Sequence, residues 1–287
     1  MSTSESTYKT FAIVGAGPSV GLPIVRALLA RNVQVVVLTR SASTREFPAG
    51  ARVAAADYSD VAAVSSVLRE HNVDVVVSAL SADGFSSQKP LADASKIAGV
   101  KLFVPSEYGM PTEGGTDGIA ILKSQFAEYL KSIELPSARI YNGLFHEYVP
   151  WLAAVPETGK FLIVGSGKTP ASYTAIEDVA GFLAHVLTTL SPSKLHNASF
   201  RIEGERGSLS DVAKLYEGKA AVEYTDAIPA EVPDAPVRNY LQHKFEEGAA
   251  STGFEFALGR DGKEPAGSSN ALWEGHHWKT LKEVLKL

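Results

Sequence analysis

Cysteine is absent from the 287 residues, and only two methionines occur. The absence of cysteine excludes disulfide bonds, thiolate nucleophiles and cysteine-ligated metal sites. No apolar run approaches the roughly 18 residues that a membrane-spanning helix requires. The polar N-terminal sequence also has no apolar core of the kind found in secretory signals. These absences predict a soluble, cytoplasmic protein without a membrane partner.

An excess of positive charge is missing as well. The formal net charge is -5 and the isoelectric point is near 5.8, which argues against a nucleic-acid partner. The pair His276 and His277 has no third ligand at a convincing spacing, so no metal site is predicted. A small-molecule substrate and a monomer or homodimer are expected.

The chain does have a glycine-rich turn between two apolar runs, residues 11–14 and 33–38. A helical pattern follows the turn, so that strand, turn, helix and strand form the βαβ unit that binds a dinucleotide. Such a turn must be tight and must let the backbone approach a pyrophosphate. The residues predicted to contact the cofactor here are Gly15, Gly17, Pro18, Ser19, Val20 and Gly21. A purely structural turn is the alternative.

Arg40 ends the second apolar run. An acidic residue at this position would accept a hydrogen bond from the ribose 2′-hydroxyl of NAD, whereas an arginine would pair with the 2′-phosphate of NADP. The next carboxylate along the chain is Glu46. Arg40 therefore favours NADPH as the cofactor, with a solvated loop arginine as the alternative.

Further apolar runs at residues 52–56, 73–80, 101–104 and 137–141 alternate with helical patterns, among them residues 88–98 and 119–132. The alternation predicts an α/β fold with a Rossmann-type, doubly wound parallel sheet. Ser59 or Asp60 is expected to cap one helix, and residues 81–87 are expected to form a flexible loop.

Beyond residue 150 the alternation weakens, and proline and glycine become frequent. We expect residues 9–150 to form the NAD(P)-binding domain and residues 151–287 a smaller, less regular substrate-binding part. Ligands of such sheets lie beyond the carboxyl ends of the strands. This places Ser78, Ala79 and Leu80 beside the cofactor.

The segments IVGAGPSVG, VVVLTR, KLFVPSEYG and IYNGLF, with a helix that carries Lys123, resemble the NmrA-like/isoflavone-reductase-like family of atypical short-chain dehydrogenases. The resemblance covers roughly residues 11–151, and its most specific pieces are residues 104–109 and Lys123. The chain departs from the family pattern at Pro18, in the first turn, and at Tyr108, where phenylalanine is common.

The resemblance implies an NADPH-dependent reductase in which Lys123 polarises or protonates the substrate oxygen. Hydride that arrives at carbon leaves negative charge on oxygen, which a nearby ammonium group stabilises. Without the resemblance, Lys123 would be interpreted as a solvated helix lysine. The further cofactor contacts that it implies are Gln88, Pro105, Ser106, Glu107, Tyr108, Lys123 and Asn142. Structural capping is equally plausible for Gln88 and Asn142.

The Tyr-x-x-x-Lys pair of typical short-chain dehydrogenases is missing around Lys123, because Ile119 stands four residues earlier. Tyr240 and Lys244 match that spacing, and we interpret them as a coincidence on a surface helix. The candidate substrate contacts are Tyr108, Phe145, His146 and Trp151. Each of these could instead be a core residue.

Three functions are compatible with these patterns. The first is an NADPH-dependent reductase of a small conjugated or aromatic molecule. The second is an NADP-binding, redox-sensing regulatory protein without catalysis. The third is a non-redox isomerase or cyclase that uses the same pocket, for which Pro18 in the turn leaves room.

Overall fold

The computed structural model describes residues 7–40 and 45–287, which fall into two compact units. Unit 1 consists of the described residues of Met1–Glu107, with Thr116–Arg139 and Val179–Phe200. Unit 2 consists of Tyr108–Gly115, Ile140–Asp178 and Arg201–Leu287. The units therefore alternate along the chain, and the functional division at residue 150 stays a prediction.

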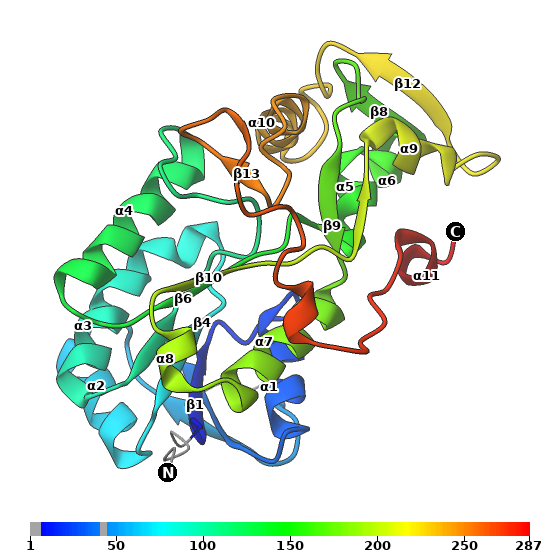
Figure 1. The fold of residues 1–287 in the computed structure, drawn as a ribbon. Helices are drawn as coiled ribbons and strands as arrows, with labels where there is room; N and C mark the ends of the chain where they lie inside the picture. Colours follow the sequence, from blue (N-terminus) through cyan, green and yellow to red (C-terminus); the bar gives the residue numbers. More distant parts are fainter. Residues whose placement is uncertain (1–6, 41–44) are drawn as a thin grey trace. The chain divides into compact units, whose positions relative to one another are not determined.

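Unit 1 is built on a five-stranded parallel sheet (Figure 1), and the order of its strands is β3-β2-β1-β4-β5. Its strands are β1 (Thr10–Val14), β2 (Gln34–Thr39), β3 (Ala51–Ala55), β4 (Val75–Ser78) and β5 (Leu102–Val104). The strand order reverses at β1, which pairs with both β2 and β4. Ligands bind at such a switch point, beyond the strands' carboxyl ends. The sheet confirms the predicted Rossmann-type fold.

Helices cover the sheet of unit 1. They are α1 (Gly21–Leu29), α2 (Val61–Glu70), α3 (Gln88–Ala98), α4 (Gly118–Ser132), α8 (Pro192–Leu195) and most of α7 (Ile176–Thr189). The predicted cap is confirmed, because the Asp60 side chain accepts a hydrogen bond from the Ala63 N–H at 2.9 Å. The prediction of a flexible loop at 81–87 is wrong: Ala82–Ser87 forms the short helix η1, which leads directly into α3.

The core of unit 1 follows the two-residue period of its strands. Ala12 and Val14 of β1 pack in one apolar cluster with Val64 of α2, Leu91 of α3 and Leu130 of α4. Alternate side chains of a strand point to opposite faces of the sheet, so this face is the one that α2, α3 and α4 cover. The rigid sheet fixes where each following loop begins.

Unit 2 has shorter strands. Strands β7 (Leu144–Phe145), β9 (Ala171–Thr174) and β11 (Glu205–Gly207) form one sheet, and β8 (Lys160–Val164) pairs with β12 (Ala221–Thr225). Its other elements are β13 (Phe254–Glu255), β14 (Arg260–Asp261), η2 (His146–Tyr148), η3 (Asn270–Leu272), α5 (Val149–Leu152), α6 (Val155–Thr158), α9 (Leu209–Lys214), α10 (Ala235–Glu246) and α11 (Leu281–Leu285). Strands β6 (Ala138–Tyr141) and β10 (Ala198–Arg201) pair where the chain passes from one unit to the other.

Across the part of the chain that the structure describes, no helix is both long and apolar enough to cross a membrane.

Candidate functional site

The glycine turn of unit 1 contains two glycines that the protein's own packing requires. Gly15 has φ +80°, and a Cβ atom on it would lie 2.6 Å from the Ala79 carbonyl oxygen. A Cβ atom on Gly21 would lie 2.2 Å from the Gly15 carbonyl oxygen. Both distances are far below a normal contact, so neither position accepts another residue without movement of the backbone.

Gly17 differs from these two. A Cβ atom on it would meet no described atom closer than 3.8 Å, apart from its chain neighbours. The protein itself therefore does not require glycine at this position. A glycine here instead keeps the space beside the turn open, as close approach of a pyrophosphate demands. This observation fits a dinucleotide.

Pro18, Ser19 and Val20 complete the turn. Pro18 is exposed, and the Leu22 N–H donates to the Gly17 carbonyl oxygen at 2.8 Å across it. Helix α1 begins after Val20, which already has helical dihedral angles. The proline is therefore accommodated at the start of the helix without disturbing the first hydrogen bonds, although it removes one N–H donor from the turn.

Arg40 is exposed just past the end of β2. Hydrogen bonds from the Ser59 backbone and side chain hold the pKa of Asp57 below its usual value, and Arg40 adds to this effect. The Tyr58 hydroxyl donates to the Leu38 carbonyl oxygen at 2.7 Å, and burial raises its pKa to about 12. The Arg40 charge is thus close to two groups that follow β3.

Arg45 makes a contact that the sequence pattern did not predict. Its guanidinium group donates to the Ala16 carbonyl oxygen at 3.0 Å. The Arg45 guanidinium therefore lies against the glycine turn. No spacing rule links residues 16 and 45, which is why sequence reasoning missed this contact.

Three predicted cofactor residues, Leu80, Gln88 and Ser106, form a hydrogen-bonded cluster in unit 1. The Ser106 hydroxyl donates to the Leu80 carbonyl oxygen at 2.7 Å, and the Ser106 N–H donates to Gln88 Oε1 at 2.8 Å. Gln88 is fully buried, and its Nε2 has no hydrogen-bond partner among residues 7–40 and 45–287. The same holds for the hydroxyl of Ser78, at the end of β4. Unpaired buried polar atoms beside a cluster of loops are typical of a ligand site.

Lys123 belongs to the same cluster. It is partly buried on α4, and its Nζ donates to the Glu107 carbonyl oxygen. Burial lowers the pKa of Lys123, while the negative charge of Glu107 opposes the shift. A partly buried ammonium group with a lowered pKa can both stabilise a nearby negative charge and release its proton more readily than a solvated lysine.

Asn142 lies in unit 2, directly after β6. Its N–H donates to the Gly109 carbonyl oxygen at 3.0 Å, and its own carbonyl oxygen accepts from Thr174 Oγ1 at 2.8 Å. Its side-chain Nδ2 donates to the Gly143 carbonyl oxygen at 3.0 Å. The remaining atom, Oδ1, is buried and has no partner within the described residues. This oxygen is therefore a polar group by which Asn142 could bind a ligand.

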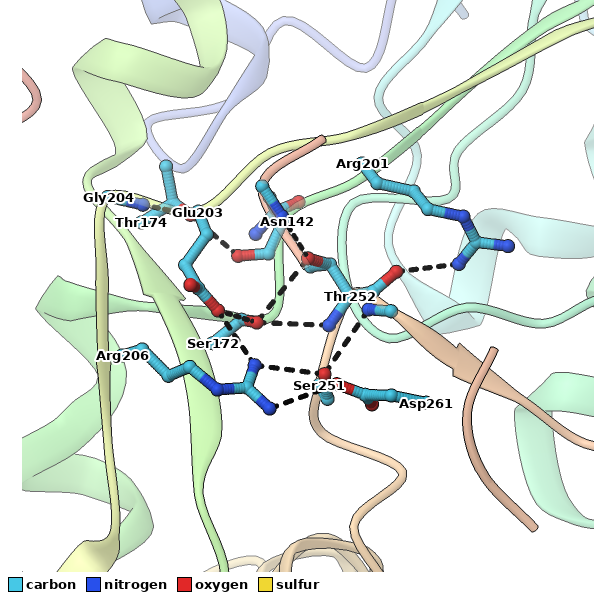
Figure 2. Close-up of polar contacts among 12 residues, drawn as sticks. Asn142, Ser172, Thr174, Arg201, Glu203, Gly204, Arg206, Ser251, Thr252 and Asp261 are labelled. Carbon is cyan, nitrogen blue, oxygen red and sulfur yellow. Dashed lines mark hydrogen bonds and ion pairs between the residues drawn. The ribbon is translucent and has the colours of Figure 1, made fainter. Parts of the chain in front are cut away.

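A polar network holds β9 next to the chain segments that follow β10 and α10 (Figure 2). The buried Ser172 hydroxyl donates to Glu203 and accepts from the Thr252 N–H at 3.0 Å. Arg206 pairs with Glu203 at 3.1 Å and with Asp261 at 3.0 Å. Because β9 pairs with β7, the network supports the position of residues 144–145. Its members are spread over 90 residues, so no sequence pattern predicted it.

Unit 2 contains a cavity of about 380 Å³. Three of the predicted substrate residues, Tyr108, Phe145 and Trp151, line it. The lining residues that sequence reasoning missed are Gly109, Met110, Gly143, Leu144, Tyr148, Leu241 and Phe245. They come from three separate segments, which only the folded chain brings together. None of the ten lining residues carries a charge.

His146, the fourth predicted substrate residue, is not among the lining residues and is fully buried. Burial lowers its pKa to about 4, and the backbone of Tyr173 opposes part of that shift. The imidazole ring is therefore neutral near pH 7. Both ring nitrogens are buried and have no hydrogen-bond partner within the described residues, and His146 does not line the cavity with the other three predicted residues.

Arg238 of α10 packs against Trp151, one of the lining residues of the cavity. The Arg238 guanidinium lies 5.0 Å from the centre of the Trp151 ring and forms two hydrogen bonds to Glu157, at 2.6 and 3.0 Å. Trp151 Nε1 also donates to Asp234 at 3.4 Å. On the same helix, Lys244 pairs with Glu247 at 2.7 Å.

In the described part of the chain, no group of three histidine or acidic residues could hold a metal ion. Within unit 1, the Ser78 hydroxyl and Gln88 Nε2 are buried polar atoms without a partner among the described residues. Together with the glycine turn they suit an organic anion with a polar ring at one end, as a dinucleotide is.

Comparisons with known proteins agree with this interpretation. The model of the NmrA-like family matches residues 7–285. The oxidoreductase BOA1 of Botryotinia fuckeliana is 33% identical over 233 residues, which are 71% of this chain and 73% of its own. Pinoresinol reductase 1 of Arabidopsis thaliana is 30% identical over 216 residues, or 65% of this chain and 67% of its own.

Among solved structures, the NADPH complex of leucoanthocyanidin reductase from Vitis vinifera superposes with a TM-score of 0.80. It is 21% identical to this chain and covers 96% of it and 98% of itself. At this level of identity the likeness concerns the fold. The matches confirm the resemblance seen in residues 11–151 and extend it over nearly the whole chain. The names of the relatives are in line with the predicted NADPH-dependent oxidoreductase.

Proposed function

This chain belongs to the NmrA-like family, and on that premise we propose that it is an NADPH-dependent reductase of a small conjugated or aromatic molecule. Unit 1 binds the cofactor, and the cavity of unit 2 binds the substrate. Lys123 polarises or protonates the oxygen of the substrate. Relatives that are named as reductases and oxidoreductases support this assignment.

One observation carries the proposal. The Lys123 amine donates to the carbonyl oxygen of Glu107, and the neighbouring Ser106 binds both Leu80 and Gln88. A lysine that was merely solvated would have its amine in water. The Lys123 amine instead belongs to a hydrogen-bonded cluster that also contains residues expected to contact the cofactor. Burial lowers its pKa.

NADPH, when bound, supplies the hydride. The open space at Gly17 and the start of α1 receive the pyrophosphate, and Arg40 pairs with the 2′-phosphate. Lys123 stabilises the negative charge that develops on the substrate oxygen, or donates a proton to it. Gln88 Nε2 and Asn142 Oδ1 are buried polar atoms left to bind the polar groups near the reacting end.

The cavity supports an aromatic or conjugated substrate. Its lining contains two tyrosines, a tryptophan, two phenylalanines and no charged residue. Flat, mostly apolar ligands bury their surface well against such walls, with a few polar groups to fix orientation. A phosphorylated or carboxylated substrate would leave its charge unpaired there.

The test is a titration of the purified chain with NADPH, NADP and NAD, followed by NADPH oxidation with a panel of aromatic and conjugated carbonyl compounds. The reductase proposal predicts tight binding of NADPH and oxidation by at least one compound. Binding without oxidation by any compound would favour the redox-sensing regulator. If neither NADPH nor NADP binds, the reductase and the regulator are both refuted, and the isomerase or cyclase is left.

A further inference from the structure

The hydroxyl group of Tyr108 is the least satisfied polar group of the cavity wall. Tyr108 lines the cavity, and its hydroxyl oxygen is closed off from water. This oxygen has no hydrogen-bond partner in the described residues. A buried hydroxyl without a partner is unfavourable, because the hydrogen bonds it made to water before folding are not replaced. A ligand that offers a hydrogen-bond acceptor to this hydroxyl therefore gains binding free energy.

The backbone at Tyr108 shows that its position is imposed by its surroundings. The residue has φ +29°, a left-handed conformation that an aromatic residue rarely adopts. The carbonyl before it, that of Glu107, accepts from Lys123. The carbonyl after it, that of Gly109, accepts from the N–H groups of Asn142 and Gly143 at 3.0 and 3.1 Å. Hydrogen bonds on both sides thus hold a strained residue in place, a combination that clusters at binding sites.

We propose that the Tyr108 hydroxyl donates a hydrogen bond to a neutral oxygen of the bound substrate, so that the cavity selects ketones over hydrocarbons of the same shape. This inference rests on the proposed function, because it takes the cavity as the substrate site. Tyr108 is one of the residues that line the cavity, so a substrate that fills the cavity lies against this residue.

The hydroxyl acts as the donor in this pair. Burial raises the pKa of Tyr108, so the phenol keeps its proton at neutral pH. A neutral carbonyl oxygen is the acceptor that such a wall accommodates at the lowest cost. A carboxylate would have to give up its hydration against a wall without charged residues.

A second tyrosine of the wall provides the matched control. Tyr148 also lines the cavity, and its ring packs 5.6 Å from Phe145 and 6.2 Å from Trp151. Unlike the hydroxyl of Tyr108, that of Tyr148 is not a buried group without a partner, and the residue is 37% exposed. Tyr148→Phe therefore removes the same atom from the same cavity without the proposed effect.

The experiment measures the binding of two probes of nearly equal shape, 2-acetylnaphthalene and 2-ethylnaphthalene, by equilibrium dialysis against the full chain, with and without saturating NADP. The wild-type chain is expected to prefer the ketone. Tyr108→Phe should weaken ketone binding about 2- to 10-fold, the range that one neutral hydrogen bond provides, and leave the hydrocarbon unchanged. Tyr148→Phe should keep the wild-type ratio.

An equal ratio of the two affinities in the wild type and in Tyr108→Phe would overturn the inference, as would failure of both probes to bind the wild-type chain. Thermal unfolding checks the fold of the variant, which should melt at or above the wild-type temperature because an unpaired hydroxyl is removed. Failure of the proposed function gives a different result. In that case the wild-type chain would neither bind nor oxidise NADPH, but it would still prefer the ketone over the hydrocarbon.

Discussion

Unit 1 and unit 2 obtain their candidate binding groups in different ways. In unit 1 the groups stand at the ends of parallel strands, at the glycine turn after β1, at Ser78 after β4 and at residues 105–107 after β5. In unit 2 the cavity is lined from three segments, residues 108–110, 143–151 and 241–245, which belong to no repeating unit.

The chemistry of the two regions differs in the same way. The site of unit 1 is polar, and hydrogen bonds from Ser106 and Lys123 fix its loops. The cavity wall of unit 2 is apolar and uncharged, and the polar Ser172 network (Figure 2) holds β9, the strand that pairs with residues 144–145 of that wall. A cofactor with fixed anionic groups suits the first arrangement, and a substrate that varies between relatives suits the second.

The sharpest test of this contrast is Lys123→Met, which keeps the side chain's length and removes its charge. We expect kcat to fall about 100- to 1,000-fold, the usual loss when a group that stabilises developing charge is removed, with little change in NADPH affinity. Stopped-flow oxidation of NADPH and a binding titration measure the two quantities. Lys96→Met is the matched control, because Lys96 also donates to a backbone carbonyl, that of Glu134 at 2.9 Å. Equal losses in both variants would contradict the assignment.

The second prediction concerns the stability of unit 2 in acid. His146 has a folded pKa of about 4 against an ordinary value of 6.5. Between these two pH values His146 is protonated in the unfolded chain and neutral in the folded chain. The free energy of unfolding therefore decreases as the pH falls from about 6.5 to 4. The loss should approach about 3 kcal/mol.

Urea unfolding at pH 7, 6, 5 and 4 measures this dependence. His146→Gln should flatten it, whereas His243→Gln should not, because His243 is exposed on α10. If the two variants and the wild type lose stability in parallel, His146 is not the titrating group.

A third prediction separates two glycines of one turn. Gly17→Ala should leave the free energy of unfolding nearly unchanged and weaken NADPH binding about tenfold, because its methyl group occupies only the space left for the pyrophosphate. Gly21→Ala should destabilise the fold, because its methyl group would meet the Gly15 carbonyl. Urea unfolding and an NADPH titration distinguish the two effects. Full NADPH affinity in Gly17→Ala would show that the pyrophosphate binds elsewhere.

The last prediction, Arg40→Ala, affects the binding of one cofactor and not the other. Removal of an exposed cation should lower NADPH affinity roughly tenfold and leave NADH affinity unchanged, since only NADPH carries the 2′-phosphate. The ratio of the two dissociation constants is the measurement. Arg52→Ala, which removes another exposed arginine from the neighbouring β3, should keep the wild-type ratio. A constant ratio in Arg40→Ala as well would remove Arg40 from the site.

The sequence predicted unit 1 well because periodicity and spacing determine it. The β-branched runs, the glycines at 15, 17 and 21 and the cap at Asp60 are local signals, and each gave an element or turn at the expected residues. The contact of Arg45 with Ala16 was missed because it depends on how a loop returns to the turn.

Unit 2 was harder to predict from sequence. Leu241 and Phe245 lie about 100 residues from the rest of the cavity lining, and the sequence around them was interpreted only as a surface helix. His146 was predicted as a substrate residue because it follows the sixth predicted strand near the presumed site, yet it is fully buried and does not line the cavity. Neighbouring positions at the end of a short strand face opposite ways, and the sequence does not reveal which way the cavity lies.

The alternation of the two units along the chain has a consequence for engineering. A cut at residue 150 would separate residues 179–200 from the sheet of unit 1, to which they belong. It would also place residues 108–115, which belong to unit 2, on the N-terminal fragment. Neither unit can be expressed as one contiguous piece. An exchange of substrate preference between relatives therefore has to transplant short internal stretches, such as 108–110 together with 241–245, rather than a C-terminal half.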